Sequence, residues 1–407
     1  MMKTKIWLAS SVMVASIGLI ATGCGKSEET PAPGQANSSS GTNGNSGKAA
    51  TAYLGLVASQ NGDLKPWGVD EVKGANLALK EFNDAGGLGD GKIAGLKIED
   101  SNSDPKTGKS AAEKLMSESV VGLVGEVASG ITAQMAEAAI AKGVPIVAVG
   151  ATKTELTALG PNIFRVCYTD AFQGPVMARF AYEQLGLRKV GIMTDQKQPY
   201  SIGLSDSFKK SFTKLGGEVV DEQKYESAQT QFNGQLTNLK SKNPEGLFLS
   251  GYFTEVGQIA RQARDAGITG PLLGGDGWDS RELVNLGGDA IIGGYYCNHY
   301  NNHEDRPEVK AFLDKWNKEY GDSPGTTMGA LGYDATKLVL EALKKCKDYT
   351  PAELAKNIEA TTDFVGVSGK ITLAGKKGNP EKRALVVKVT KNGDEFVKAY
   401  EWFPPEN

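Results

Sequence analysis

Short apolar runs alternate with helically spaced apolar residues along most of the chain. Residues 52–57 form the first run, and Ala75, Ala78, Leu79 and Phe82 then recur at the spacing of one helix face. Further strands are expected at residues 96–99, 120–127, 144–149, 163–167, 190–193, 218–220, 247–250, 271–273 and 291–297, with helices between most of them. Strands that alternate with helices predict an α/β fold with parallel sheets.

Strands and helices alternate over more residues than a single hydrophobic core usually contains. The cleanest helical pattern lies late in the run, with Val256, Ile259, Ala260 and Ala263 on one face and a stop at Gly267. Residues 51–407 exceed the size at which single cores stop growing. We therefore expect two lobes of similar design, with a ligand cleft between them that closes about a hinge.

The end of the chain has a different pattern. A helix is expected to begin at Pro307, and another follows it. Residues 384–390 and 395–402 then flank Asn392-Gly393, which is typical of a β-hairpin.

Small polar residues follow two neighbouring strands of the first expected lobe. The run that ends at Val127 is followed by Ser129, and the next run by Gly150, Ala151 and Thr152. The carboxyl ends of parallel strands share one sheet edge, where open α/β sheets bind ligands. Ser129 lies just before a helix, so its hydroxyl and the free N–H groups of the first turn can receive an anion. The pattern predicts a carboxylate-binding site.

The N-terminus predicts an extracytoplasmic protein. Lys3 and Lys5 precede an apolar run at residues 6–21, which ends shortly before Cys24. This arrangement resembles a bacterial lipoprotein signal over residues 1–24, with lipidation at Cys24. The run is short for a spanning helix. Residues 25–50 have the composition of a flexible tether. We expect a lipid anchor to the cell envelope, in the periplasm or on the outer face of the cytoplasmic membrane.

Charge and residue counts exclude several classes of protein. A net charge of −3 without a basic stripe argues against nucleic acid as a partner. Cys167, Cys297 and Cys346 allow at most one disulfide, and buried thiols are the favoured interpretation. A zinc site at Cys297, His299 and His303 would lack a fourth ligand. Motifs of hydrolases, metalloproteases and phosphate loops are missing, so we expect neither an enzyme nor a bound cofactor or metal.

Seven segments, spread over the folded part, carry a family resemblance. They are GANLALKEFNDAGG (74–87), EVASGIT (126–132), VAVGATKTEL (147–156), DAFQGP (170–175), DQKQPYSIGL (195–204), SGYFTEVGQIARQARDAG (250–267) and GGDGWDS (274–280). With them, residues 51–402 resemble the leucine/isoleucine/valine-binding protein family, the substrate-binding subunits of branched-chain amino acid ABC importers.

The resemblance implies the type I periplasmic-binding-protein fold, two parallel-sheet α/β lobes joined by a three-strand hinge. The chain would cross between the lobes near Tyr168, His299 and Ala374. The N-terminal lobe would then comprise residues 51–168 and 299–373, and the C-terminal lobe residues 169–298 and 374–407.

The resemblance also implies a site for a zwitterion. Ser129 and Thr152, with the backbone at Gly150, match the groups that hold the α-carboxylate. Asp276, followed by Gly277, matches the acid that pairs with the α-ammonium. The family's leucine-binding member has a glutamate there, so a direct and a water-mediated pairing both stay open.

The remaining site residues are also carried over from the family. Tyr200, Tyr252 and Trp67 match aromatic residues that close over the ligand. Met328 aligns with an aromatic that bounds the side-chain pocket, and this difference leaves leucine specificity open. Asp170 matches a supporting polar residue at the hinge edge.

The implied function is capture of an α-amino acid, branched-chain or aromatic, and its delivery to an ABC permease with its ATPase subunits. The protein would act as a monomer that touches the membrane through its lipid. The alternative is the same fold binding an aromatic or short organic acid. That ligand would need the carboxylate site but no ammonium partner, so Asp276 argues against it.

Overall fold

The computed structural model describes residues 51–404. The expected lipoprotein signal (1–24), its Cys24 and the tether (25–50) lie outside the described residues. Within residues 51–404, no helix combines the length and the apolar character needed to cross a bilayer.

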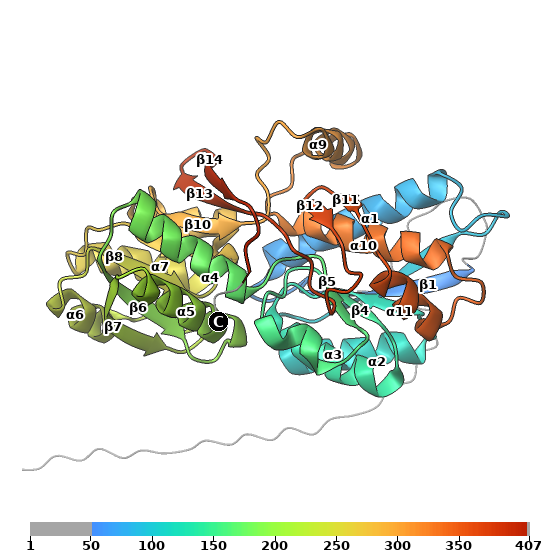
Figure 1. Cartoon of the computed structure of the whole chain (residues 1–407), viewed down its shortest axis with the longest axis horizontal. Helices are drawn as coiled ribbons and strands as arrows, with labels where there is room; N and C mark the ends of the chain where they lie inside the picture. The colour runs from blue at the N-terminus through green and yellow to red at the C-terminus, as the bar shows by residue number, and fades with distance from the viewer. Residues whose placement is uncertain (1–50, 405–407) are drawn as a thin grey trace, which may run out of the picture. The chain divides into compact units, whose positions relative to one another are not determined.

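The first lobe is built on a five-stranded parallel sheet in the order β2-β1-β3-β4-β5. Its strands are β1 (Ala52–Ala58), β2 (Ala94–Asp100), β3 (Gly122–Val124), β4 (Ile146–Ala148) and β5 (Ile163–Arg165). Helices α1 (Lys65–Asp84), α2 (Pro105–Ser117), α3 (Ser129–Lys142), α10 (Met328–Lys344) and α11 (Pro351–Glu359) belong to it (Figure 1). A short hairpin of β11 (Phe364–Gly366) and β12 (Gly369–Ile371) follows α11.

The second lobe contains a seven-stranded sheet in the order β14-β13-β10-β9-β8-β6-β7. Its strands are β6 (Lys189–Asp195), β7 (Glu218–Tyr225), β8 (Gly246–Ser250), β9 (Leu272–Gly274), β10 (Tyr295–Asn298), β13 (Ala384–Thr390) and β14 (Gly393–Tyr400). The helices are α4 (Asp170–Arg179) with a π-helical end (Phe180–Gln184), α5 (Pro199–Lys214), α6 (Asn233–Ser241), α7 (Phe253–Asp265) and α8 (Arg281–Gly287). The predicted α/β fold with parallel sheets is confirmed. In the second sheet only β13 runs against the other strands, and its pairings with β10 and β14 are antiparallel.

Local sequence explains where many helices begin. Proline lies in the first turn of α1, α2, α5, α9 (Pro307–Tyr320) and α11, where its missing N–H costs no hydrogen bond. Asp104 accepts a hydrogen bond from the Thr107 amide and so caps α2. The predicted start of a helix at Pro307 is thus confirmed.

Helices α1 and α10 pack closely across the first lobe. A side chain at Gly74 of α1 would place its Cβ only 1.9 Å from the carbonyl oxygen of Gly329 in α10. Glycine is therefore required at position 74, where the middle of α1 approaches the first turn of α10.

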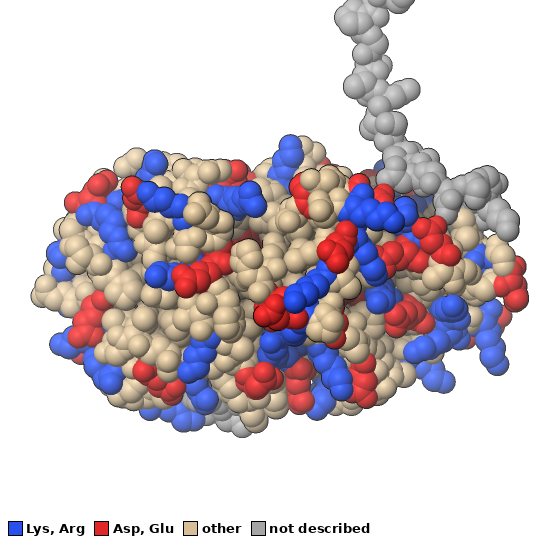
Figure 2. Space-filling view, turned by 90° about the horizontal axis from the view of Figure 1, so that it is seen from above, with Lys and Arg blue, Asp and Glu red and all other residues tan. Residues whose placement is uncertain are grey.

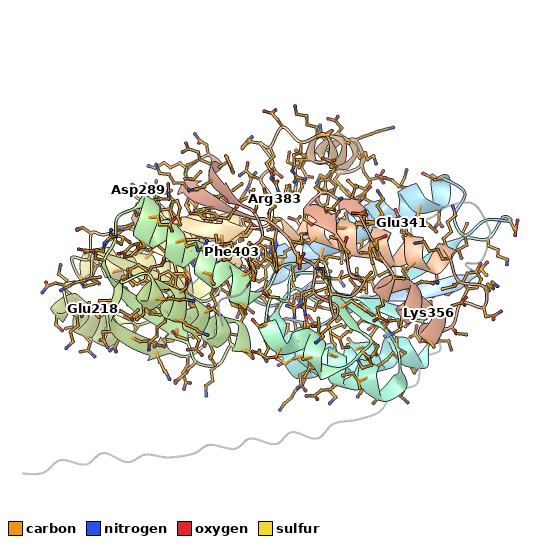
Figure 3. All side chains as sticks on the ribbon, viewed as in Figure 1. Glu218, Asp289, Glu341, Lys356, Arg383 and Phe403 are labelled. Carbon is orange, nitrogen blue, oxygen red and sulfur yellow. The ribbon has the colours of Figure 1, made fainter. Side chains whose placement is uncertain are left out.

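The hairpin predicted near the C-terminus is confirmed and completes the second sheet. Strand β13 pairs antiparallel with β10 and with β14. Beyond the hairpin, the Phe403 ring packs against Phe172, with ring centroids 5.0 Å apart, and lies 4.1 Å from the Arg179 guanidinium (Figure 3). The end of the chain is thereby attached to α4.

Several sequence expectations need correction. The strand expected at residues 120–127 is limited to β3, and the one expected at 291–297 begins only at Tyr295. Tyr200 lies in the first turn of α5, because Pro199 begins the helix one residue earlier. Ser129, expected just before α3, is its first residue, and Ala128 is the N-cap. Helices α4, α8 and α11, which are at most 10 residues long, were not predicted.

The surface carries charges of both signs. On the face in Figure 2, Lys and Arg side chains are interspersed with Asp and Glu. No single-sign field covers that face, in keeping with the small net charge of −3.

Candidate functional site

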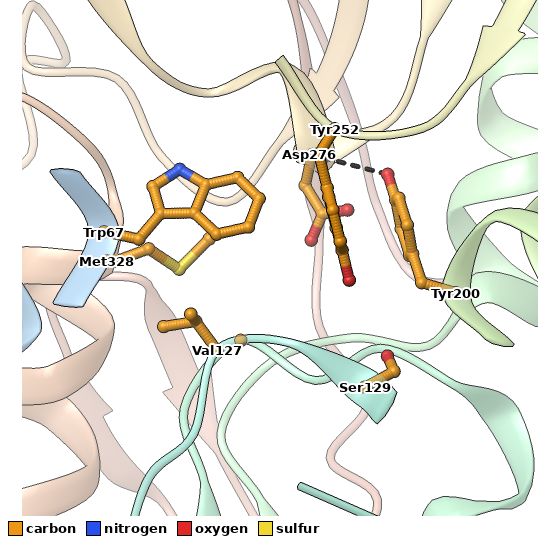
Figure 4. Close-up of a pocket in the computed structure, with 9 residues that line it drawn as sticks. Trp67, Val127, Ser129, Tyr200, Tyr252, Asp276 and Met328 are labelled. Atoms are coloured by element: carbon orange, nitrogen blue, oxygen red, sulfur yellow. Dashed lines mark hydrogen bonds between the residues drawn. The ribbon is translucent and has the colours of Figure 1, made fainter. Parts of the chain in front are cut away.

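A small cavity lies among the residues that sequence reasoning singled out. It is lined by Trp67, Val127, Ser129, Gly150, Tyr200, Tyr252, Asp276, Gly277 and Met328 (Figure 4). Trp67, Val127 and Met328 gather toward one end, whereas Ser129, Asp276 and Tyr200 lie toward the other. The cavity is therefore apolar at one end and polar at the other.

The positions of these residues follow from the topology. Val127, Gly150, Tyr252 and Asp276 come shortly after β3, β4, β8 and β9 respectively. Trp67 lies in the first turn of α1, directly after β1. Because the strands are parallel, their carboxyl ends and the following helix N-termini meet at one edge of each sheet.

Ser129 is suited to bind an anion. Its side chain is buried, and its Oγ accepts a hydrogen bond from the Lys153 amide at 3.1 Å. That bond leaves the hydroxyl hydrogen to donate to another group. The N-cap residue Ala128 makes no side-chain cap, so the first-turn N–H groups of α3 add the positive end of the helix dipole.

Thr152 and Asp170 lie behind the cavity wall. The Thr152 carbonyl accepts from the Asp170 amide at 2.8 Å, and its Oγ1 accepts from Gln173 Nε2 at 3.4 Å. Burial, together with the nearby charge of Asp276, raises the pKa of Asp170 to about 7, although hydrogen bonds from Thr152 and Gln173 act to lower it. Ala151, Thr152 and Asp170 do not line the cavity, and their assignment as ligand contacts stays a prediction.

Asp276 lines the cavity and has two protein partners. Its Oδ1 accepts from Gln173 Nε2 at 3.0 Å, and its Oδ2 accepts from His299 Nε2 at 3.0 Å. The Asp276 amide also donates to Gln173 Oε1 at 3.2 Å. Gln173 and His299 thus hold this carboxylate in a defined orientation.

Three aromatic rings form one wall of the cavity. Tyr200 and Tyr252 are stacked, with centroids 5.3 Å apart, and Trp67 meets Tyr252 edge-on at 5.2 Å. The Tyr200 hydroxyl accepts from the Gly277 amide at 2.9 Å. Among the described residues the Tyr252 hydroxyl is buried without a hydrogen-bond partner, and burial raises the pKa of Tyr252. An unpartnered buried hydroxyl in a cavity wall is a natural contact for a polar ligand group.

Met328, the first residue of α10, limits the apolar end. A Cβ built on Gly150 would lie 2.8 Å from Met328 Sδ and 3.2 Å from the Val127 carbonyl oxygen. Glycine at position 150 therefore leaves room for the thioether, and the two residues together set the size of this end.

The two lobes are in contact around the cavity. The Trp67 indole N–H donates to the Asp279 carbonyl oxygen at 2.6 Å. The Thr327 amide and hydroxyl donate to Asp279 Oδ2 at 2.6 and 2.7 Å. Trp67 and Thr327 come from the first lobe and Asp279 from the second, so the structure is a closed form.

Sequence reasoning missed three residues of this site. Val127 was considered only as the end of a strand, and Gln173 only as part of the segment DAFQGP. His299 was considered as a zinc ligand. Its place just after β10, beside the strand that leads to Asp276, was the signal that could have identified it. The three cysteines beyond Cys24 are all buried free thiols.

Comparison with known proteins agrees with this arrangement. A family model described as periplasmic binding protein matches residues 51–394. The Leu/Ile/Val-binding protein homolog 1 of Brucella abortus is 30% identical over 342 residues, covering 83% of this chain and 90% of that protein.

Solved structures show the same fold. The leucine-binding protein LivK of Thermotoga maritima has a TM-score of 0.81 at 32% identity, covering 86% of this chain and 99% of that one. The branched-chain amino acid transporter substrate-binding protein LivJ of Streptococcus pneumoniae, solved with isoleucine, has a TM-score of 0.80 at 31% identity, with 86% and 99% coverage. The chain therefore belongs to the periplasmic binding proteins, within the family of leucine/isoleucine/valine-binding substrate-binding proteins of ABC transporters.

Proposed function

We propose that this protein captures an apolar α-amino acid outside the cytoplasm by closure of its two lobes and presents it to an ABC permease and its ATPase subunits. The lobes that move would be residues 51–168 with 299–373 and residues 169–298 with 374–407. The role is binding and release, without a catalytic step, and the protein acts as a monomer.

The division of the cavity into a polar and an apolar end carries the proposal. Ser129 and the N-terminus of α3 supply hydrogen-bond donors for a carboxylate, and Asp276 supplies an acceptor for an ammonium group. Trp67, Val127 and Met328 supply apolar surface for an aliphatic or aromatic side chain. A zwitterion with an apolar side chain complements all three groups at once.

The expected specificity is moderate. An apolar pocket separates ligands that differ by one methylene by about 1–3 kcal/mol. Met328 is unbranched and adaptable, so neighbouring aliphatic amino acids should bind with overlapping affinities.

A second candidate is a ligand with a carboxylate but no ammonium group. It is favoured by the two hydrogen bonds that Asp276 already accepts from Gln173 and His299, which satisfy the carboxylate within the protein. It is disfavoured because a buried carboxylate facing the cavity repels a second anion.

Isothermal titration with leucine and with 4-methylpentanoate, which is leucine without its amino group, separates the two candidates. We expect leucine to bind more tightly. Asp276→Asn should lose about 2–5 kcal/mol of leucine binding, whereas 4-methylpentanoate, no longer repelled by the carboxylate, should bind the variant at least as tightly as the unmodified protein. Equal or tighter binding of 4-methylpentanoate by the unmodified protein would contradict the amino acid assignment.

We also propose that Cys24 carries the lipid anchor. In cells fed an alkyne-labelled fatty acid, the full chain should become labelled and partition with the membrane. Cys24→Ser should stay unlabelled, whereas Cys346→Ser, which alters a buried thiol, serves as the matched control. Equal labelling of the Cys24→Ser variant would refute the anchor.

A further inference from the structure

We infer that His299 is the positioning residue for Asp276, and that the pair, rather than the aspartate alone, allows the site to distinguish α-amino acids from plain carboxylic acids. The inference rests on the proposed function and adds a specificity determinant to the same site.

The sheet register brings the two residues together. Strands β9 and β10 are parallel, with Leu273 opposite Tyr295 and Gly274 opposite Tyr296. Asp276 and His299 follow these strands at the same edge, and their side chains meet at 3.0 Å. The two side chains are 4% and 0% exposed, so water does not compete for the bond.

His299 is itself held firmly in place. Its ring stacks on Tyr168, with centroids 4.0 Å apart and planes inclined by 19°. Its amide donates to Asn298 Oδ1 at 2.8 Å. His299 and Tyr168 both lie on segments expected to cross between the lobes, so the hinge itself sets the ring orientation.

The surroundings favour a neutral ring that donates from Nε2. Among the described residues, Nδ1 is buried without a hydrogen-bond partner, so a second N–H there would lose its hydrogen bonds to water. Burial lowers the pKa of His299, and Asp276 acts in the opposite direction. Lys382 also lowers this pKa, whereas Asp279 raises it. A neutral donor orients Asp276 without cancelling its negative charge, which stays available to an ammonium group.

The orientation of the carboxylate matters more for an aspartate, such as Asp276, than it would for a glutamate with its longer side chain. A carboxylate on a short side chain reaches a ligand only from a narrow range of positions. His299 at Oδ2 and Gln173 at Oδ1 fix both oxygens. Loss of the histidine donor would leave a buried carboxylate oxygen unpaired and free to turn away from the cleft.

Variants at position 299 of the full chain test the inference, with dissociation constants measured for leucine and 4-methylpentanoate. His299→Leu removes the donor at similar volume. We expect this variant to raise the dissociation constant of leucine about 10- to 100-fold. The dissociation constant of 4-methylpentanoate should change by no more than about twofold. His299→Gln keeps an N–H at comparable reach and should restore most of the selectivity. The other histidine, His303, is exposed, and His303→Leu is the matched control.

Each outcome has a distinct meaning. A His299→Leu protein that keeps the leucine preference of the unmodified chain, or that loses both ligands equally, would overturn the positioning role while the proposed function stands. An unmodified protein that shows no preference for leucine would overturn the proposed function first. If His299→Leu does not fold, His299→Gln and His299→Asn replace it. They differ in reach by one methylene, and equal selectivity in both would refute the inference.

Discussion

The indole N–H of Trp67 donates to the carbonyl oxygen of Asp279 at 2.6 Å, joining residues from different lobes that are 212 positions apart in the sequence. The same Asp279 accepts two hydrogen bonds from Thr327 through its side chain. Because these bonds join the two lobes, we expect opening of the cleft to break them, so that their free energy contributes to ligand retention rather than to the stability of either lobe.

Trp67→Phe should therefore weaken ligand binding by about 1 kcal/mol, roughly fivefold, because an aromatic ring is kept but the indole N–H that forms the interlobe hydrogen bond is lost. Small-angle scattering should show a larger open fraction at subsaturating leucine. Trp402→Phe, outside the cavity lining, controls for loss of an indole. Unchanged affinity in Trp67→Phe would mean that this bond does not stabilise the closed form.

Ser129→Ala should weaken the binding of leucine and of 4-methylpentanoate equally, by about 1–2 kcal/mol, because both ligands present the same carboxylate to the Ser129 hydroxyl. Titration calorimetry on both ligands measures this effect. Ser117→Ala removes an exposed hydroxyl from the end of α2 and should change neither value. A loss confined to leucine would place Ser129 near the amino group instead.

Gly150→Ala should reduce leucine affinity by pushing Met328 into the cavity, since the new Cβ would lie 2.8 Å from its sulfur. Met328→Ala should shift preference toward larger side chains such as phenylalanine. The double variant should bind more tightly than the sum of the two single losses predicts, with a coupling of about 0.5–3 kcal/mol. Strict additivity would show that the two residues do not share the pocket wall.

Glu71→Gln should change how stability depends on pH. Glu71 is fully buried, and among the described residues its two carboxylate oxygens have no hydrogen-bond partner. Burial raises its pKa well above 4.5, and the neighbouring Glu126 raises it further. Above pH 4.5 the unfolded chain has lost this proton while the folded chain keeps it, so unfolding becomes easier as the pH rises toward the folded pKa.

The contribution of Glu71 is about 1.4 kcal/mol per pH unit in that window. Urea unfolding at pH 5 and pH 8 should show that Glu71→Gln gains stability relative to the unmodified chain at pH 8. Glu137→Gln alters an exposed acid and should behave like the unmodified chain. Parallel pH profiles for Glu71→Gln and the unmodified protein would mean that Glu71 keeps no proton in the fold.

The sequence by itself determined the features that depend on local pattern. Apolar periodicity predicted the alternation of strands and helices, and Pro307 predicted the start of α9. Because strands in such units are parallel, the same pattern also predicted that Ser129 and Gly150 share one sheet edge. These expectations hold because they depend only on neighbouring residues. Side chains repeat their direction every 2 residues in a strand and every 3.6 residues in a helix, and the missing N–H and fixed backbone angle of proline favour the start of a helix.

Only the tertiary structure decided which side chains pair at the site. Gln173 and His299 reach Asp276 from 103 and 23 positions away, and Trp67 meets Asp279 across the cleft. Thr152, predicted to face the ligand beside Ser129, also contacts Asp170 and Gln173. Strand register, helix packing at Gly74 and closure of the lobes set these pairings. Each of them depends on contacts between distant segments that no local pattern encodes.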